Sequence, residues 1–129
     1  MKKAIESAEA PRALGPYSPA VEIGDLVFCS GQIGIDPRSG KMVEGGVEAE
    51  TRRALESLRE ILIAAGVSFA DVVKTTIFLA DMKDWELVNR VYGEHLEPPY
   101  PARSTVQVAA LPRHARVEIE MIARRSARK

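Results

Sequence analysis

The chain has 129 residues, 46% hydrophobic and 28% charged, and this size and composition fit one domain spanning residues 1–129. Eighteen Lys and Arg balance eighteen Asp and Glu, so the net charge is zero at pH 7. The chain therefore lacks the overall positive field that gathers nucleic acid or an anionic membrane, and we expect neither as a partner.

The few cysteine and histidine residues narrow the possible chemistry. Cys29 is the single cysteine, so no internal disulfide can form, which suits a reducing compartment. Cys29, His95 and His114 offer no zinc-ligand spacing, and we expect no metal. Residues 1–20 hold no apolar stretch typical of a secretory signal, and no run approaches the roughly 20 apolar residues of a membrane helix. These features predict a cytoplasmic protein.

The first third of the chain predicts short strands and turns. A weak strand is expected at residues 3–6, followed by a loop rich in Pro and Gly at residues 11–19. Two short apolar runs, residues 20–23 and 26–30, flank a Gly-Asp pair. Glycine adopts positive φ without steric cost, so this arrangement predicts a β-hairpin.

The middle of the chain predicts two helices separated by a strand. Apolar residues recur every three or four positions over residues 47–65, which predicts an amphipathic helix, and Gly66 follows as its C-terminal glycine. The β-branched segment 72–79 is typical of a strand. A shorter apolar stripe over residues 85–96 predicts a second helix, with Asp84 as its N-cap.

Two final strands, at residues 103–109 and 115–123, complete the order βββαβαββ. Helices placed between strands indicate an α+β fold, a mixed β-sheet with two helices packed on one face. The other face stays uncovered, and such faces usually meet a partner chain, so we expect an oligomer. We interpret the four basic residues between positions 124 and 129 as a solvated tail.

Candidate chemical groups lie mainly on the last two strands. Alternation places Glu118 and Glu120 on the face opposite the core, where they either face water or, at a subunit interface, act as acid or base. Arg103 offers donors that suit a carboxylate or phosphate, although the pattern alone favours an ordinary surface arginine. Tyr17 either walls a pocket or packs on the core. Cys29 is expected to be a buried hydrophobe and not a nucleophile.

Seven short motifs, spread from residue 10 to the last strand, form an ordered set. They are Ala10-Pro11, Gly15-Pro16-Tyr17-Ser18, Ser30-Gly31-Gln32-Ile33, Val73-Lys74-Thr75-Thr76, Asn89-Arg90-Val91-Tyr92, Pro101-Ala102-Arg103-Ser104 and Val117-Glu118-Ile119-Glu120. As a set, and above all through Pro-Ala-Arg-Ser followed by Glu-Ile-Glu, the sequence resembles the Rid family, also called YjgF, of reactive-intermediate deaminases.

The resemblance implies a chorismate-mutase-like α+β fold and a homotrimer with its sites between subunits. It also implies hydrolysis of 2-imino acids and enamines, such as 2-aminoacrylate, 2-iminobutanoate and 2-iminopropanoate, to 2-keto acids and ammonia. Pyridoxal-phosphate enzymes release these reactive species, and the deaminase itself would need no cofactor. Which imino acid is preferred stays open.

The resemblance further assigns roles to individual residues. Arg103 would bind the substrate carboxylate, Tyr17 would cover it, and Glu120 would activate water and manage protons at the imine nitrogen. Five other residues would line the pocket: Ser30, Gly31, Asn89, Ser104 and Thr105. Many family members have cysteine where this chain has Thr105, so a covalent thiol mechanism is in doubt here.

Two other functions stay open from the sequence. A non-catalytic trimer that binds keto acids or similar carboxylates would need Arg103 but would gain little from Glu120. The family's older labels, endoribonuclease and translation inhibitor, fit poorly with zero net charge and with the lack of a basic groove carrying aromatic residues.

Overall fold

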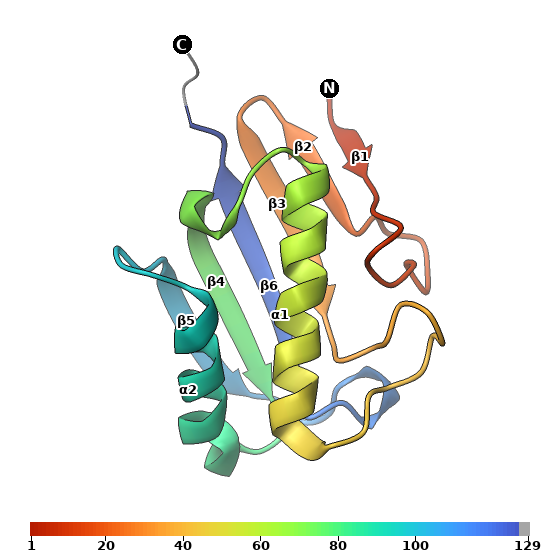
Figure 1. The fold of residues 1–129 in the computed structure, drawn as a ribbon, viewed down its shortest axis with the longest axis vertical. Coiled ribbons are helices and arrows are strands. Elements are labelled where there is room, and N and C mark those ends of the chain that lie inside the picture. Colours follow the sequence, from red (N-terminus) through yellow and green to blue (C-terminus); the bar gives the residue numbers. More distant parts are fainter. Residues whose placement is uncertain (127–129) are drawn as a thin grey trace.

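Six strands and two helices make up residues 1–126 of the computed structural model, the part of the chain that the structure describes (Figure 1). The strands are β1 (Lys3–Ile5), β2 (Ala20–Ile23), β3 (Leu26–Gln32), β4 (Val72–Leu79), β5 (Ala102–Gln107) and β6 (Val117–Arg124). The helices are α1 (Gly46–Ala64) and α2 (Trp85–His95), and the short 3₁₀ turns are η1 (Phe69–Asp71), η2 (Met82–Asp84) and η3 (Pro112–His114). The order βββαβαββ is thus confirmed. No helix in residues 1–126 has the length and apolar character that crossing a bilayer requires.

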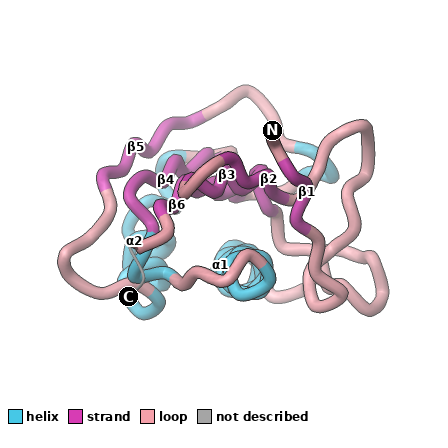
Figure 2. The backbone as a smooth tube through the Cα atoms, turned by 90° about the horizontal axis from the view of Figure 1, so that it is seen from above, coloured by secondary structure: helices cyan, strands magenta, loops and turns pink. Residues whose placement is uncertain are grey.

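The sheet is mixed, and its strand order is β1-β2-β3-β6-β4-β5. Every neighbouring pair is antiparallel except β4 and β5, which run parallel and are connected through α2. Both α-helices lie on the same face of the sheet, as expected, and no α-helix of the described residues covers the opposite face (Figure 2). Strand β5 lies at one edge, so one side of its backbone has no neighbouring strand among residues 1–126.

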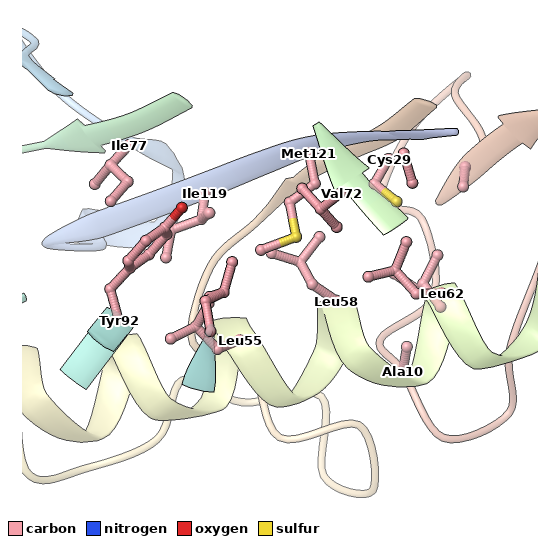
Figure 3. Close-up of a cluster of buried hydrophobic side chains, with 14 of the residues drawn as sticks. Ala10, Cys29, Leu55, Leu58, Leu62, Val72, Ile77, Tyr92, Ile119 and Met121 are labelled. Carbon is pink, nitrogen blue, oxygen red and sulfur yellow. The ribbon is translucent and has the colours of Figure 1, made fainter. Parts of the chain in front are cut away.

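The core lies between α1, α2 and the helix-facing side of the sheet. Alternate residues of β6, among them Ile119 and Met121, are at most 1% exposed. The apolar stripe of α1 packs against them through Leu55, Leu58 and Leu62 (Figure 3). A helix stripe with a period near 3.6 and a strand with a period of two therefore bury matching faces, as the sequence pattern predicts.

The contact made by Asp84 differs from the expected helix cap. Asp84 does precede α2, but its carboxylate accepts hydrogen bonds from Arg116 at 2.8 and 3.0 Å and caps nothing. Asp81 instead caps the turn η2, accepting from the backbone N–H of Lys83 at 2.9 Å. A capping residue usually has extended backbone, whereas Asp84 has φ −83° and ψ 0°. Asp84 therefore holds the predicted N-cap position of α2, but its side chain makes no capping bond because η2 runs directly into α2 and Asp81 caps that turn.

The basic residues after β6 are partly built into the fold. The Arg125 side chain is 24% exposed, pairs with Glu22 at 3.3 Å and donates to the carbonyl of Ala65. The solvated-tail interpretation is therefore wrong for Arg125, because this residue ties the end of the sheet to the end of α1. Arg128 and Lys129 lie outside the described residues.

Candidate active site

A β-bulge interrupts the pairing of β3 with β6. The register runs from the Cys29–Met121 pair to the Gln32–Ile119 pair, so β3 uses one residue more than β6 over this stretch. The extra residue lies in the Ser30-Gly31 segment. Bulges bend a strand and redirect its side chains, and they are frequent beside active sites. The bulge therefore marks this part of the sheet as a candidate site.

Gly31 makes room at the bulge for the side chain of Glu118. A β-carbon built on Gly31 would lie 2.8 Å from Cδ and 2.9 Å from Cγ of Glu118, closer than real side chains approach. Gly31 is not among the glycines with positive φ, so its backbone is open to other residues. Glycine thus leaves open the space that the Glu118 carboxyl occupies, and any side chain at this position would make that carboxyl move.

Glu118 and Glu120 point from β6 to the helix-free face, two residues apart. Glu118 is half-buried and Glu120 is exposed. Burial, and after it the negative charge of Glu120, raise the pKa of Glu118 above its ordinary value. Neither carboxyl forms an ion pair with another residue in the range 1–126. Glu118 therefore stays protonated up to a higher pH than an ordinary glutamate does, and a general acid needs this property.

A cleft of about 490 Å³ opens beside these two carboxyls. Leu14, Ile33 and Ile35 contribute to its apolar lining, and polar side chains including those of Glu118 and Glu120 also line it. Apolar walls with a few converging polar groups are typical of small-molecule sites. Four of the predicted site residues line this cleft together with Glu118, namely Tyr17, Ser30, Gly31 and Glu120.

The loop before β2 is folded back to form one wall of the cleft. The Tyr17 hydroxyl accepts from the backbone N–H of Leu14 at 3.2 Å, and 51% of Tyr17 is exposed. The Ser30 hydroxyl donates to the carbonyl of Ser18 at 2.6 Å, and its backbone N–H donates to the carbonyl of Pro19 at 2.9 Å. Tyr17 thus walls the cleft and does not pack into the core, which resolves the alternative left by the sequence.

Arg103 lies on the other face of the sheet. In the parallel pairing of β4 with β5, Arg103 stands beside Thr75, which is fully buried on the helix side. Its guanidinium carbon lies 4.9 Å from the centre of the Tyr92 ring on α2. A second cleft, of about 340 Å³, is lined by Asn89, Tyr92, Tyr100 and Arg103. Two predicted site residues, Asn89 and Arg103, therefore meet in a different cleft from Glu120.

The neighbours of Arg103 on β5 are divided between the two faces. Ser104 pairs with Thr76, which pairs in turn with Glu120, so these three residues form a row across the helix-free face. Thr105 returns to the helix side, and its hydroxyl oxygen is buried without a hydrogen-bond partner among residues 1–126. One chain therefore does not bring Arg103 and Glu120 together, and their meeting across a subunit interface stays a prediction.

Two residues that the structure places in these clefts, Glu118 and Tyr92, are missing from the site residues assigned from the sequence, although Glu118 was a candidate acid or base. Alternation had put Glu118 on the same face as Glu120, but only the bulge shows that Glu118 is the half-buried carboxyl. Tyr92 belongs to the apolar stripe of α2, and nothing in that pattern indicates its contact with Arg103. Cys29 is a buried hydrophobe, as predicted, and burial raises its pKa to about 12.

A protein-family model described as Endoribonuclease L-PSP matches residues 7–125, nearly the whole chain. The chain belongs to the Rid family. A mouse member named 2-iminobutanoate/2-iminopropanoate deaminase is 52% identical over 123 residues, which cover 95% of this chain and 91% of the mouse protein.

Solved structures of similar chains superpose on this chain over nearly its whole length. A Thermotoga maritima protein superposes with a TM-score of 0.95 at 48% identity, covering 98% of this chain and 100% of its own. TdcF from E. coli, solved with bound serine, superposes with a TM-score of 0.89 at 43% identity, covering 96% of this chain and 99% of its own. The chorismate-mutase-like fold expected from the sequence is therefore confirmed.

Proposed function

We propose that this Rid protein is a hydrolytic deaminase that converts 2-imino acids, and the enamines that tautomerise to them, into 2-keto acids and ammonia. The observation that carries the proposal is the half-buried Glu118 beside Glu120 in an apolar-walled cleft, because a protein that only binds carboxylates has no need of a proton-holding carboxyl. The names of the mouse and human relatives, 2-iminobutanoate/2-iminopropanoate deaminase, support the substrate class. We also propose a cytoplasmic location, which suits the free, buried thiol of Cys29.

The complete site is proposed to lie between subunits of a homotrimer. The β5 edge and α2 of one chain would supply Arg103 and Asn89, and the cleft of the next chain would supply Tyr17, Glu118 and Glu120. Three features support this arrangement: the two clefts lie on different faces, the hydroxyl of Thr105 lacks a partner among the described residues, and the helix-free face exposes Phe28 and Val106.

In this site Arg103 would bind the substrate carboxylate through two parallel hydrogen bonds and so fix the position of the adjacent C=N bond. The bound serine of TdcF offers a carboxylate next to a nitrogen-bearing carbon, the same pairing of groups that a 2-imino acid presents. Tyr17 would close over the bound carboxylate. Ser30 and Gly31 would line the pocket on one side, and Ser104 on the other.

The chemistry needs a proton at nitrogen and a water at carbon. Glu118 in its protonated form would donate to the imine nitrogen, and its carboxylate would then accept a proton from the attacking water. The reprotonated Glu118 then gives its proton to the amino group of the resulting carbinolamine; the C–N bond breaks, ammonia leaves, and the hydroxyl proton returns to the Glu118 carboxylate as the carbonyl of the 2-keto acid forms. Glu120, to which the resemblance assigns both water activation and proton transfer, would keep the first role by orienting the water and, through its charge, would keep the proton on Glu118, to which we reassign the second role because Glu118 is the half-buried carboxyl. Positioned proton transfer of this kind is typically worth about 10²–10⁴-fold in rate.

The route needs no cofactor, because hydrolysis of an imine changes no oxidation state. It also needs no thiol. Thr105 stands where many family members have cysteine, and a threonine hydroxyl is not ionised at neutral pH, so no covalent intermediate is proposed at this position. Imines already hydrolyse in water, so a modest site suffices.

The test couples an amino-acid oxidase or threonine dehydratase, which generates the imine in place, to trapping by semicarbazide. We expect the wild-type protein to suppress trapping and to release free 2-keto acid, and Arg103→Ala and Glu118→Gln to lose this effect about 10²-fold or more. Glu44→Gln, an exposed glutamate outside both clefts, serves as the matched control and should behave as wild type. Binding of 2-ketobutyrate without any suppression would refute the deaminase and favour the carboxylate-binding trimer.

A further inference from the structure

Arg103 is held by the face of an aromatic ring. Its guanidinium carbon lies 4.9 Å from the centre of the Tyr92 ring, within the range of a cation–π contact. Its side chain makes no hydrogen bond or ion pair with any residue in the part of the chain that the structure describes. Because no residue in the range 1–126 accepts a hydrogen bond from the guanidinium, its five N–H donors are available for a ligand.

Tyr92 is itself fixed in place from two sides. The residue is 4% exposed on α2, and its hydroxyl lies 2.9 Å from the hydroxyl oxygen of Thr75, which is fully buried on β4. Figure 3 shows the Tyr92 ring standing on α2 with its hydroxyl directed at the sheet. Thr75 is also the residue that pairs with Arg103 across β4 and β5. Each of Thr75, Tyr92 and Arg103 thus lies next to the other two. The position of the Tyr92 ring is therefore fixed both by its own helix and by the sheet.

The ring stays neutral under all ordinary conditions. Burial raises the pKa of the Tyr92 hydroxyl, although the bond to Thr75 and the charge of Arg103 act against this shift. A protein carboxylate in the same place would hold Arg103 more strongly, but it would occupy the donors that the substrate needs. A neutral ring can orient the guanidinium without competing for its hydrogen bonds.

We propose that Tyr92 is a positioning residue, which holds the Arg103 guanidinium in advance in the orientation that binds the substrate carboxylate. The proposal rests on the carboxylate-binding role given to Arg103 in the proposed function. An arginine side chain has many rotamers, and ordering it before binding lowers the cost of capturing a ligand. Tyr92 acts only through Arg103, so its loss should weaken binding and leave the chemical step nearly unchanged.

The test compares Tyr92→Met, which fills the space without a ring face, with Tyr92→Phe, which keeps the ring. We expect Tyr92→Met to raise KM for the imine, and Kd for 2-ketobutyrate measured by calorimetry, by about tenfold, with kcat within twofold of wild type. Tyr92→Phe should raise both by less than about threefold. Tyr92→Leu serves as a second ring-free variant where Tyr92→Met fails to fold.

Two controls separate positioning from structural damage. Val88→Ala, a core truncation on the same helix, should lower the melting temperature and leave Kd unchanged. In an Arg103→Ala background, Tyr92→Met should add no further loss of affinity, because the residue it positions is gone. Equal losses in both backgrounds, or the same Kd for Tyr92→Met and wild type, would overturn the proposal.

The binding readout also distinguishes this proposal from the deaminase. A wild-type protein that binds 2-ketobutyrate without hydrolysing imines would refute the deaminase, and the Kd values of the variants would still decide the role of Tyr92. A wild-type protein whose binding does not depend on Arg103 would overturn the positioning role, whatever its activity.

Discussion

Gly31→Ala tests whether the position of Glu118 matters for activity. The new β-carbon would overlap Oε2 of Glu118 and lie 2.8 Å from its Cδ, whereas ordinary contact begins at 3.4 Å, so the carboxyl has to move out of its present position. Misplacing a catalytic group by about 1 Å can cost about 10²-fold in rate. We therefore expect kcat/KM to fall by about 10²-fold.

The assay is suppression of semicarbazide trapping, run beside urea unfolding of the same variants. Gly40→Ala is the matched control, because Gly40 has φ +72°, has nothing within 4 Å of an added β-carbon, and lies outside the cleft. It should lose about 1–2 kcal/mol through backbone strain and keep its activity within twofold. A Gly31→Ala protein with wild-type kcat/KM would show that the bulge does not position a catalytic carboxyl.

Three further predictions concern stability and reactivity. Folding raises the pKa of Glu118 above 4.5, so the folded chain binds this proton more tightly than the unfolded chain and loses stability as pH rises through the raised pKa. Glu118→Gln removes that loss, so in urea unfolding this variant should be more stable than wild type at pH 7.5. Below about pH 4.5 the two proteins should be equally stable in this respect. The opposite trend would contradict a raised pKa for Glu118. Leu58→Ala, which empties a fully buried position of α1, should lower the free energy of unfolding by about 2–5 kcal/mol, and a loss below about 1 kcal/mol would place Leu58 outside the core. Cys29, with a pKa of about 12, should react with Ellman's reagent only after denaturation; rapid labelling of the native protein would show an accessible thiolate.

Most of the fold could be predicted because periodicity and turn residues are local signals. The stripe over residues 47–65 and the β-branched run 72–79 match α1 and β4 within one residue at each end. The final strands were expected at residues 103–109 and 115–123, and they shift because η3 takes up the chain between them. Contacts between distant segments, such as that of Asp84 with Arg116, leave no local signal.

The candidate site could be predicted only in part, for the same physical reason. Alternation placed Glu118 and Glu120 on one face, but their different burial depends on a bulge formed between β3 and β6, which are far apart in sequence. The face on which Arg103 lies depends on its parallel pairing with β4, and a lone arginine at the start of a strand does not reveal that register. The resemblance to the Rid family supplied the residues, and the structure supplied their division between two clefts.

Because the predicted site residues are divided between two clefts, the central claim is that one active site is built from two chains. Mixing two inactive variants tests this claim most directly. Arg103→Ala and Glu118→Gln chains, each inactive alone, would be unfolded together in equal amounts and refolded. In random trimers about one site in four combines an intact Arg103 with an intact Glu118 from the neighbouring chain, so the mixture should recover about a quarter of wild-type activity. A mixture no more active than its parents would place both residues in a site within one chain and contradict the account.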